Sequence, residues 1–200
     1  MDRQCEEADF KRDTATHEMS ILKDEGLYRH LRFKRPGSYT FCFDIVTWPG
    51  YLSITGDMGC YVFSRIEDMI YFFSGEHINP YYWSEKMQAV NTKGSNTYHY
   101  KQWSGEKFLE NLQKHFNGRH TNAEDAVKEF EAFKESSSIE YIETSDEYEA
   151  IAFIREHTCE LLDFSEYDNT VYTYHYIWCC WALRWGANTY LKTKGDPVDG

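Results

Sequence analysis

The sequence predicts an α+β protein in which a short antiparallel β-meander of about four strands is packed by N-terminal and C-terminal helices and carries a helical acidic insertion. Three observations lead to this fold class. Apolar and polar residues alternate with a period of two between residues 27 and 63, helical apolar spacing dominates from residue 64 to 158, and residues 171–192 are apolar on every side of a helix. Because 42% of the chain is hydrophobic and 18% is aromatic, it can bury a sizeable core, and we expect a single domain over residues 1–200.

The first half of the chain is predicted to contain a helix, the meander and a second helix. Residues 2–25 lack Gly and Pro and stop at Gly26, which predicts an N-terminal helix with a glycine C-cap. Turn signals then separate short alternating segments, which predicts hairpins rather than crossovers. The turns fall at Pro36-Gly37, Pro49-Gly50 and Gly56–Gly59, and the expected strands cover residues 27–34, 39–48, 51–55 and 60–63. Ser64 and Glu67 fit a capping box, so a helix should follow and end near Gly75.

The second half of the chain is predicted to be mostly helical. Apolar residues recur at helical spacing in four segments, of which the last three belong to a helical acidic region at residues 104–168. The four segments cover residues 81–90, 104–116, 122–136 and 144–158. The final helix, residues 171–192, carries Trp178, Trp181 and Trp185 on one stripe. That stripe is most simply the seam between this aromatic core helix and the sheet, and any exposed part of it would be an anchor for a partner.

Negative charge is concentrated in one stretch of the chain. Residues 124–168 contain fifteen Asp and Glu residues against Lys128, Lys134 and Arg155, a net charge of −12 that equals the charge of the whole chain. Such a local field favours a basic partner and repels nucleic acid, so direct DNA binding is not expected. Solvated helix faces are the alternative interpretation of the same charge. The candidate partner-binding residues are Glu124, Asp125, Glu129, Glu131, Glu135, Glu143, Asp146, Glu147, Glu149 and Glu156.

A second candidate site lies on the predicted sheet. Arg29, Arg32, Asp44 and Asp57 bring cations and carboxylates into the meander, which would suit a small nucleotide- or metal-dependent enzyme or binding protein. The period of two places Arg29 and Arg32 on opposite faces of their strand, so they do not form one phosphate clamp. Asp44 lies among apolar neighbours and needs a cation, for which Arg29 or Arg32 is the natural partner.

No catalytic, cofactor or metal signature accompanies these residues, so the sequence favours a binding protein over an enzyme and predicts no cofactor and no metal. The phosphate-loop, dinucleotide and serine-nucleophile fingerprints are absent, as are the paired-cysteine and paired-histidine metal motifs. The N-terminus lacks the apolar run of a signal peptide, and no stretch is long and apolar enough to span a membrane. We therefore expect a cytoplasmic protein whose six cysteines stay reduced.

Two parts of the chain resemble a known protein family. The chain is similar to an uncharacterised family of accessory proteins of tailed bacteriophages and prophages in LKDEGLYRHLRF, DIVTWPGYLSITGDMG and YVFSRIEDM, within residues 17–73, and in YTYHYIWCCWALRWG at residues 172–186. The resemblance implies no activity, cofactor or site residue. It implies membership of a class of small phage proteins that often block host defences or redirect host enzymes. The acidic stretch departs from the family pattern.

The charge and the resemblance together lead to a functional hypothesis. We expect a phage-encoded inhibitor, located in the cytoplasm of the bacterial host, that binds a host defence protein or nuclease complex such as a CRISPR effector and mimics nucleic acid through its acidic surface. The first alternative is the sheet-face enzyme or binding protein, which requires a pocket joining its four residues. The second is an oligomeric structural or interaction protein, in which the tryptophan stripe would be buried between chains.

Overall fold

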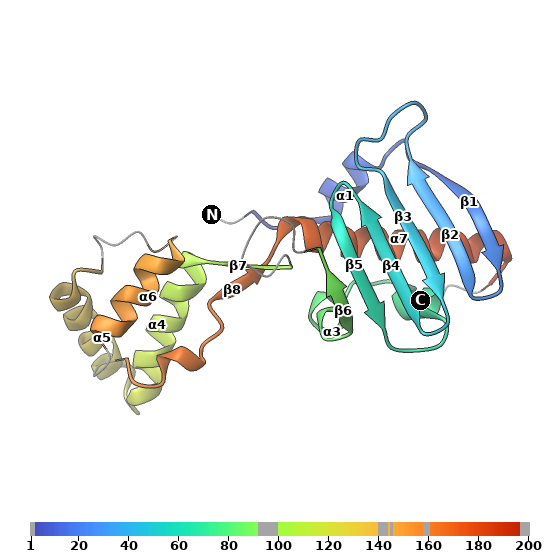
Figure 1. Cartoon of the computed structure of the whole chain (residues 1–200). Helices are drawn as coiled ribbons and strands as arrows, with labels where there is room; N and C mark the ends of the chain where they lie inside the picture. The colour runs from blue at the N-terminus through green and yellow to red at the C-terminus, as the bar shows by residue number, and fades with distance from the viewer. Residues whose placement is uncertain (1–2, 92–99, 140–143, 145, 158–160, 197–200) are drawn as a thin grey trace. The chain divides into compact units, whose positions relative to one another are not determined.

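The computed structural model describes residues 3–91, 100–139, 144, 146–157 and 161–196. Contacts within the chain group it into two compact units. We call them the sheet unit, Arg3–Tyr100 with Tyr172–Gly200, and the helical unit, Lys101–Val171. The fold is α+β (Figure 1). The helical unit interrupts the sheet unit in sequence, and its bounds enclose the predicted helical acidic region.

The sheet unit is built on a six-stranded antiparallel sheet whose strands follow chain order. The strands are β1 (Glu18–Glu25), β2 (Tyr28–Lys34), β3 (Phe43–Trp48), β4 (Tyr51–Gly56), β5 (Gly59–Ser64) and β6 (Met87–Val90). Each strand pairs with its neighbour in sequence, as expected for a meander. The four predicted strands correspond to β2–β5, and the turns between them place Gly37, Gly50 and Gly59 at positive φ. The sheet is therefore two strands larger than predicted.

The N-terminal segment is a short helix followed by a strand, and the prediction of one helix over residues 2–25 is wrong. Helix α1 covers Glu7–Asp13, and β1 then pairs with β2. Gly26 has a φ of +62°, but it lies in the two-residue turn of the β1–β2 hairpin and does not end a helix. Seven of the eight residues of β1 are exposed, so this edge strand lacks the apolar alternation by which a strand is recognised.

Two other predicted helices differ from the observed ones. Helix α2 (Met69–Phe73) is capped by Asp68, whose carboxylate accepts a hydrogen bond from the Ile70 N–H, and not by Ser64. Residues 81–90, predicted as one helix, contain most of α3 (Pro80–Ser84) and then β6. Pairing of β6 with β5 overrides the helical apolar spacing at this point.

Helix α7 (Tyr174–Lys194) crosses one face of the sheet and supplies much of the core of the sheet unit (Figure 1). The Trp178 ring lies 5.7 Å from the Phe43 ring, and the Trp185 ring lies 5.1 Å from the Phe33 ring. The prediction that the tryptophan stripe forms the seam with the sheet is confirmed for these two residues by their ring contacts. Trp178 is fully buried, whereas Trp181 and Trp185 are partly buried. Among the described residues of the sheet unit, no helix covers the opposite face of the sheet, which is turned toward the viewer in Figure 1.

The helical unit has a core of its own, made mostly of phenylalanine. Its elements are β7 (Lys101–Trp103), α4 (Gly105–Arg119), α5 (Ala123–Ser137), α6 (Glu147–Glu156), a 3-10 helix (Phe164–Glu166) and β8 (Thr170–Tyr172), with β7 paired to β8. Phe108, Phe116, Phe133, Phe153 and Phe164 are each at most 5% exposed. The three helices predicted between residues 104 and 158 are confirmed.

Candidate functional site

The acidic stretch lies within the helical unit. Residues 101–171 carry a net charge of −10, against −12 for the whole chain. Helix α5 presents the exposed carboxylates of Glu124, Glu131 and Glu135 along one side, in a row interrupted by Lys128, because these spacings return to nearly the same direction on a helix. Both α5 and α6 bury Ala and Phe on their other side. We use the term acidic surface for the exposed carboxylates of these two helices, which are Glu124, Asp125, Glu131, Glu135, Glu149 and Glu156.

Several of the predicted partner-binding carboxylates have partners inside the helical unit. Glu129 forms an ion pair with Arg119, and its carboxylate also contacts His120 Nε2, at the end of α4. Asp146 caps α6 by accepting hydrogen bonds from the first N–H groups of that helix at 2.8 and 3.2 Å. Glu131 lies 2.7 Å from the Lys134 ammonium, one turn further along α5. Glu143 lies outside the described residues. The other predicted residues are exposed or partly exposed: Glu124, Asp125, Glu135, Glu147, Glu149 and Glu156.

Arg32, Asp44 and His30 form one cluster on the uncovered sheet face. The Asp44 carboxylate accepts two hydrogen bonds from the Arg32 guanidinium, at 2.9 and 2.8 Å, and His30 Nε2 lies 2.8 Å from Asp44 Oδ2. Arg32 and Asp44 are direct cross-strand neighbours, so the strand register creates the pair. Burial opposes ionisation of Asp44, but the hydrogen bonds from Arg32 and His30 outweigh it and lower the carboxyl pKa. Arg32 is thus the cation that the sequence required for Asp44.

Arg29 lies on the opposite face of the sheet and connects β2 to α2 and α7. Its guanidinium donates to both Asp68 carboxylate oxygens, at 2.8 and 2.7 Å, and to the Tyr190 hydroxyl at 3.1 Å. The Tyr190 hydroxyl in turn donates to Asp24 at 2.8 Å. The Arg29 side chain is 10% exposed. It is therefore part of a buried polar network and not of a sheet-face site.

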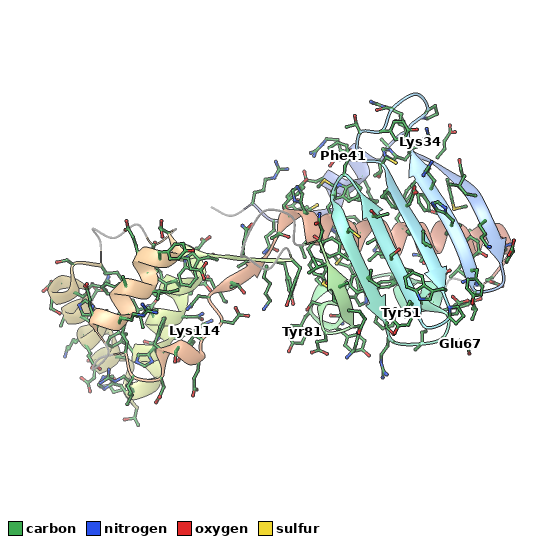
Figure 2. All side chains as sticks on the ribbon, in the orientation of Figure 1. Lys34, Phe41, Tyr51, Glu67, Tyr81 and Lys114 are labelled. Carbon is green, nitrogen blue, oxygen red and sulfur yellow. The ribbon has the colours of Figure 1, made fainter. Side chains whose placement is uncertain are left out.

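Asp57 lies in the β4–β5 turn and holds the loop that precedes β3. Its carboxylate accepts a hydrogen bond from the Phe41 N–H at 2.7 Å. Phe41, labelled in Figure 2, has a φ of +57°, which is unusual for a bulky residue. Its carbonyl accepts from His17 Nε2 at 3.1 Å. Because Asp57, Arg29 and the Arg32–Asp44 pair occupy separate environments, the four sheet residues do not share one pocket.

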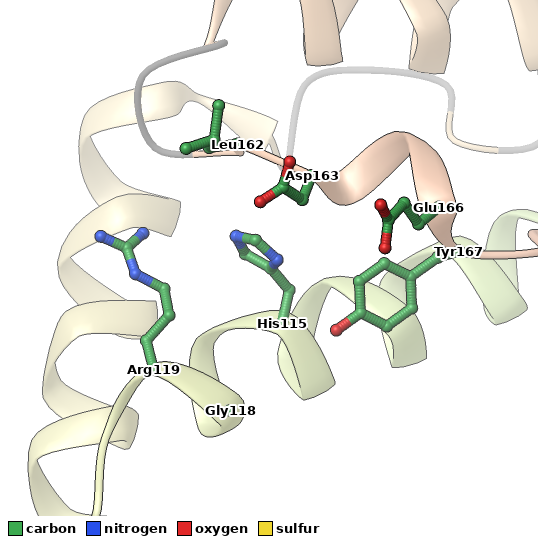
Figure 3. Close-up of a pocket in the computed structure, with 7 residues that line it drawn as sticks. All are labelled: His115, Gly118, Arg119, Leu162, Asp163, Glu166 and Tyr167. Carbon is green, nitrogen blue, oxygen red and sulfur yellow. The ribbon is translucent and has the colours of Figure 1, made fainter.

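A cavity of about 600 Å³ lies in the helical unit, between α4 and residues 162–167 (Figure 3). Its volume falls within the range of small-molecule binding sites. One wall is formed by His115 and Arg119, one turn apart on α4, and the other by Leu162, Asp163, Glu166 and Tyr167. Sequence reasoning missed this cavity, because a 3-10 turn with no periodic pattern forms one of its walls. The only sequence signal is the spacing of His115 and Arg119.

Metal sites and membrane spans are absent from the described residues. No three His, Cys, Asp or Glu residues there are placed to hold a metal ion. The cysteines in this part of the chain are free thiols, namely Cys5, Cys42, Cys60, Cys179 and Cys180. None of the described helices combines the length and the apolar character needed to cross a membrane.

The acidic surface and the cavity are therefore the features of the helical unit that offer charge and shape to a partner. The sheet unit offers the Arg32–Asp44–His30 cluster on its uncovered face. Comparison of the chain with protein-family models, with curated proteins and with solved structures gives no match.

Proposed function

We propose that the protein is a phage-encoded inhibitor that binds a host nucleic-acid-handling defence complex, such as a CRISPR effector or another defence nuclease, through the acidic surface. The observation that carries this proposal is the confinement of a net charge of −10 to one helical unit with its own aromatic core. Lys and Arg residues that normally contact phosphates would contact carboxylates instead, so the surface acts as a nucleic-acid mimic. Inhibition of this kind is stoichiometric and needs no catalytic residue.

The regular spacing of carboxylates along a helix supports this proposal. Glu131 and Glu135 are separated by one helical turn, or about 6 Å along the axis, so neighbouring carboxylates can engage neighbouring cations of a groove. A concentrated negative field also accelerates encounter with a basic surface and weakens as ionic strength rises. Binding should therefore be fast and strongly dependent on salt.

Three charge reversals on the acidic surface test the proposal. Glu124→Lys, Glu135→Lys and Glu156→Lys change exposed carboxylates for which the described residues provide no ion-pair partner. Glu129 and Asp146 are left intact, because they hold helices in place. The matched control reverses three exposed carboxylates of the sheet unit: Glu18→Lys, Glu67→Lys and Glu76→Lys. Both variants change the net charge equally.

The assay combines affinity capture from host lysate with competition. The proposal expects a nucleic-acid-binding protein that the wild-type chain and the control variant capture, that the acidic-surface variant loses, and that double-stranded DNA displaces. The proposal is wrong if the acidic-surface variant captures the same partners as the wild type, or if excess DNA leaves the captured complex intact.

A further inference from the structure

The cavity of the helical unit has two chemically different walls (Figure 3). On the α4 wall, the Arg119 guanidinium lies 3.3 Å from the Glu129 carboxylate and 5.6 Å from the centre of the Phe116 ring. Its charge is therefore already compensated. On the opposite wall lie the carboxylates of Asp163 and Glu166, for which the described residues provide neither a hydrogen-bond donor nor a cation. As far as the described residues go, the cavity thus presents uncompensated negative charge from one side.

The 3-10 helix and its N-cap residue place these two carboxylates on the same wall of the cavity. Asp163 is the N-cap residue of this helix, with a φ of +63°, and Glu166 is the last residue of the helix, so both flank the same single turn. Phe164 lies between these two residues in sequence and is fully buried, so it anchors the turn to the core. Figure 3 shows the Asp163 and Glu166 side chains above the α4 wall, with the Tyr167 ring below Glu166 and Leu162 beside Asp163.

The chemistry of the walls selects a cation. An anion would meet two carboxylates for which the described residues provide no cation, in a unit whose net charge is −10. A cation would meet those carboxylates, the aromatic ring of Tyr167 and an apolar residue that is 69% exposed, Leu162. Arginine fits this combination better than lysine, because its planar guanidinium can bridge two carboxylates and stack on an aromatic ring, while its aliphatic stem packs against Leu162.

We propose that this cavity accepts the side chain of an arginine presented by the basic partner of the helical unit. The inference rests on the proposed function, because it takes the partner to be a basic protein. It adds a specific recognition point to a surface that otherwise recognises charge alone. Arginine is one of the residues most often found as an anchor that fills a pocket at a binding hot spot.

Two peptides of equal charge test the inference on the full chain, one carrying arginines and one carrying lysines at the same positions. The wild type should bind the arginine peptide at least about five-fold more tightly, and binding should shift the imidazole NMR signals of His115. Asp163→Asn with Glu166→Gln should weaken arginine-peptide binding by about ten-fold or more and remove the preference. Tyr167→Leu, which changes no charge, should also reduce the preference.

The matched control neutralises two exposed carboxylates on α5, by Glu124→Gln with Glu135→Gln. It should weaken both peptides equally, by no more than about three-fold, because exposed charges act through a screened field. Circular dichroism verifies that each variant is folded. If the cavity and α5 variants lose the same affinity, or if the wild type binds both peptides equally, the cavity inference is wrong while the acidic-surface proposal stands. If neither peptide binds, the cavity inference also fails, and the capture experiment decides the acidic surface separately.

Discussion

Gly186 allows α7 to lie directly on the sheet, and replacing it with alanine should destabilise the sheet unit. A Cβ at this position would lie 2.5 Å from Ile45 Cδ1 and 3.2 Å from the Phe33 ring. Both neighbours are 0% exposed, and the Phe33 ring is stacked on Phe43 at 4.7 Å, so neither has free space into which it could retreat.

Two opposing effects set the size of the loss. Overpacking a tight core costs about 1–3 kcal/mol, whereas alanine in place of glycine within a helix contributes about 0.5–1 kcal/mol of stability. Gly186→Ala should therefore lower the free energy of unfolding by about 1 kcal/mol net. The control is Gly118→Ala in α4, where an added Cβ meets no atom within 4 Å. This variant should instead be more stable, by about 0.5 kcal/mol.

Urea denaturation measures both effects. Tryptophan fluorescence reports mainly on the sheet unit, because every tryptophan except Trp103 belongs to it, and circular dichroism at the helical band reports on the helical unit as well. Ile45→Val removes the atom that the new Cβ would strike. In the wild type, Ile45→Val should lower the free energy of unfolding by about 0.5–1.5 kcal/mol, whereas in the Gly186→Ala variant the same change should lower it hardly at all. Two results would refute the reasoning. One is that Gly186→Ala stabilises the sheet unit, as Gly118→Ala is expected to stabilise the helical unit. The other is that the losses in free energy of unfolding caused by Gly186→Ala and Ile45→Val are additive.

Three further predictions concern other parts of the fold. Arg29→Ala leaves the Asp68 carboxylate without its cation in a largely buried network, so urea denaturation should show a loss of about 3–5 kcal/mol, partly restored by adding Asp68→Ala. Burial lowers the pKa of His17 below 6.5, so as the pH falls the unfolded chain binds a proton at this residue before the folded chain does. The free energy of unfolding, measured by urea denaturation, should therefore decrease as the pH drops below 6.5, and His17→Gln should make this decrease smaller. Ser138→Gly, at a C-cap with a φ of +56°, should stabilise the helical unit by about 0.5–1 kcal/mol in thermal melts followed by circular dichroism.

The central strands could be predicted from sequence, whereas the edge strands could not. The four central strands alternate between the core and the open face and are separated by glycine turns, so their pattern is local. β1 is exposed on nearly every residue, and β6 is only four residues long. Both are strands because a neighbouring strand offers hydrogen bonds, and that information is not contained in their own residues.

The same limit applies to the candidate sites. The two-residue period of a strand correctly predicted that Arg29 and Arg32 lie on opposite faces of the sheet. Only the strand register, however, shows that Arg32 is the cross-strand neighbour of Asp44. Nothing local distinguishes Glu129, which pairs with Arg119 and His120, from the exposed Glu135 six residues later. Both lie on the same helix with similar neighbours in sequence, and their roles differ because of residues on another helix.

The positions of the carboxylates along the helices bear on the choice between a solvated surface and a binding surface. Glu124 and Asp125 in the first turn of α5, and Glu147 and Glu149 in the first turn of α6, stabilise helix N-termini, so these charges have a structural reason. Glu135 lies near the end of α5, and Glu156 is the last residue of α6, where negative charge opposes the helix dipole. Glu135→Gln with Glu156→Gln should therefore raise the melting temperature of the helical unit. If this stabilised variant also loses partner binding, those two charges are kept for recognition at the expense of stability. If binding is unchanged, Glu135 and Glu156 have neither a structural role nor a binding role. The solvated-surface interpretation is then the correct one for these positions.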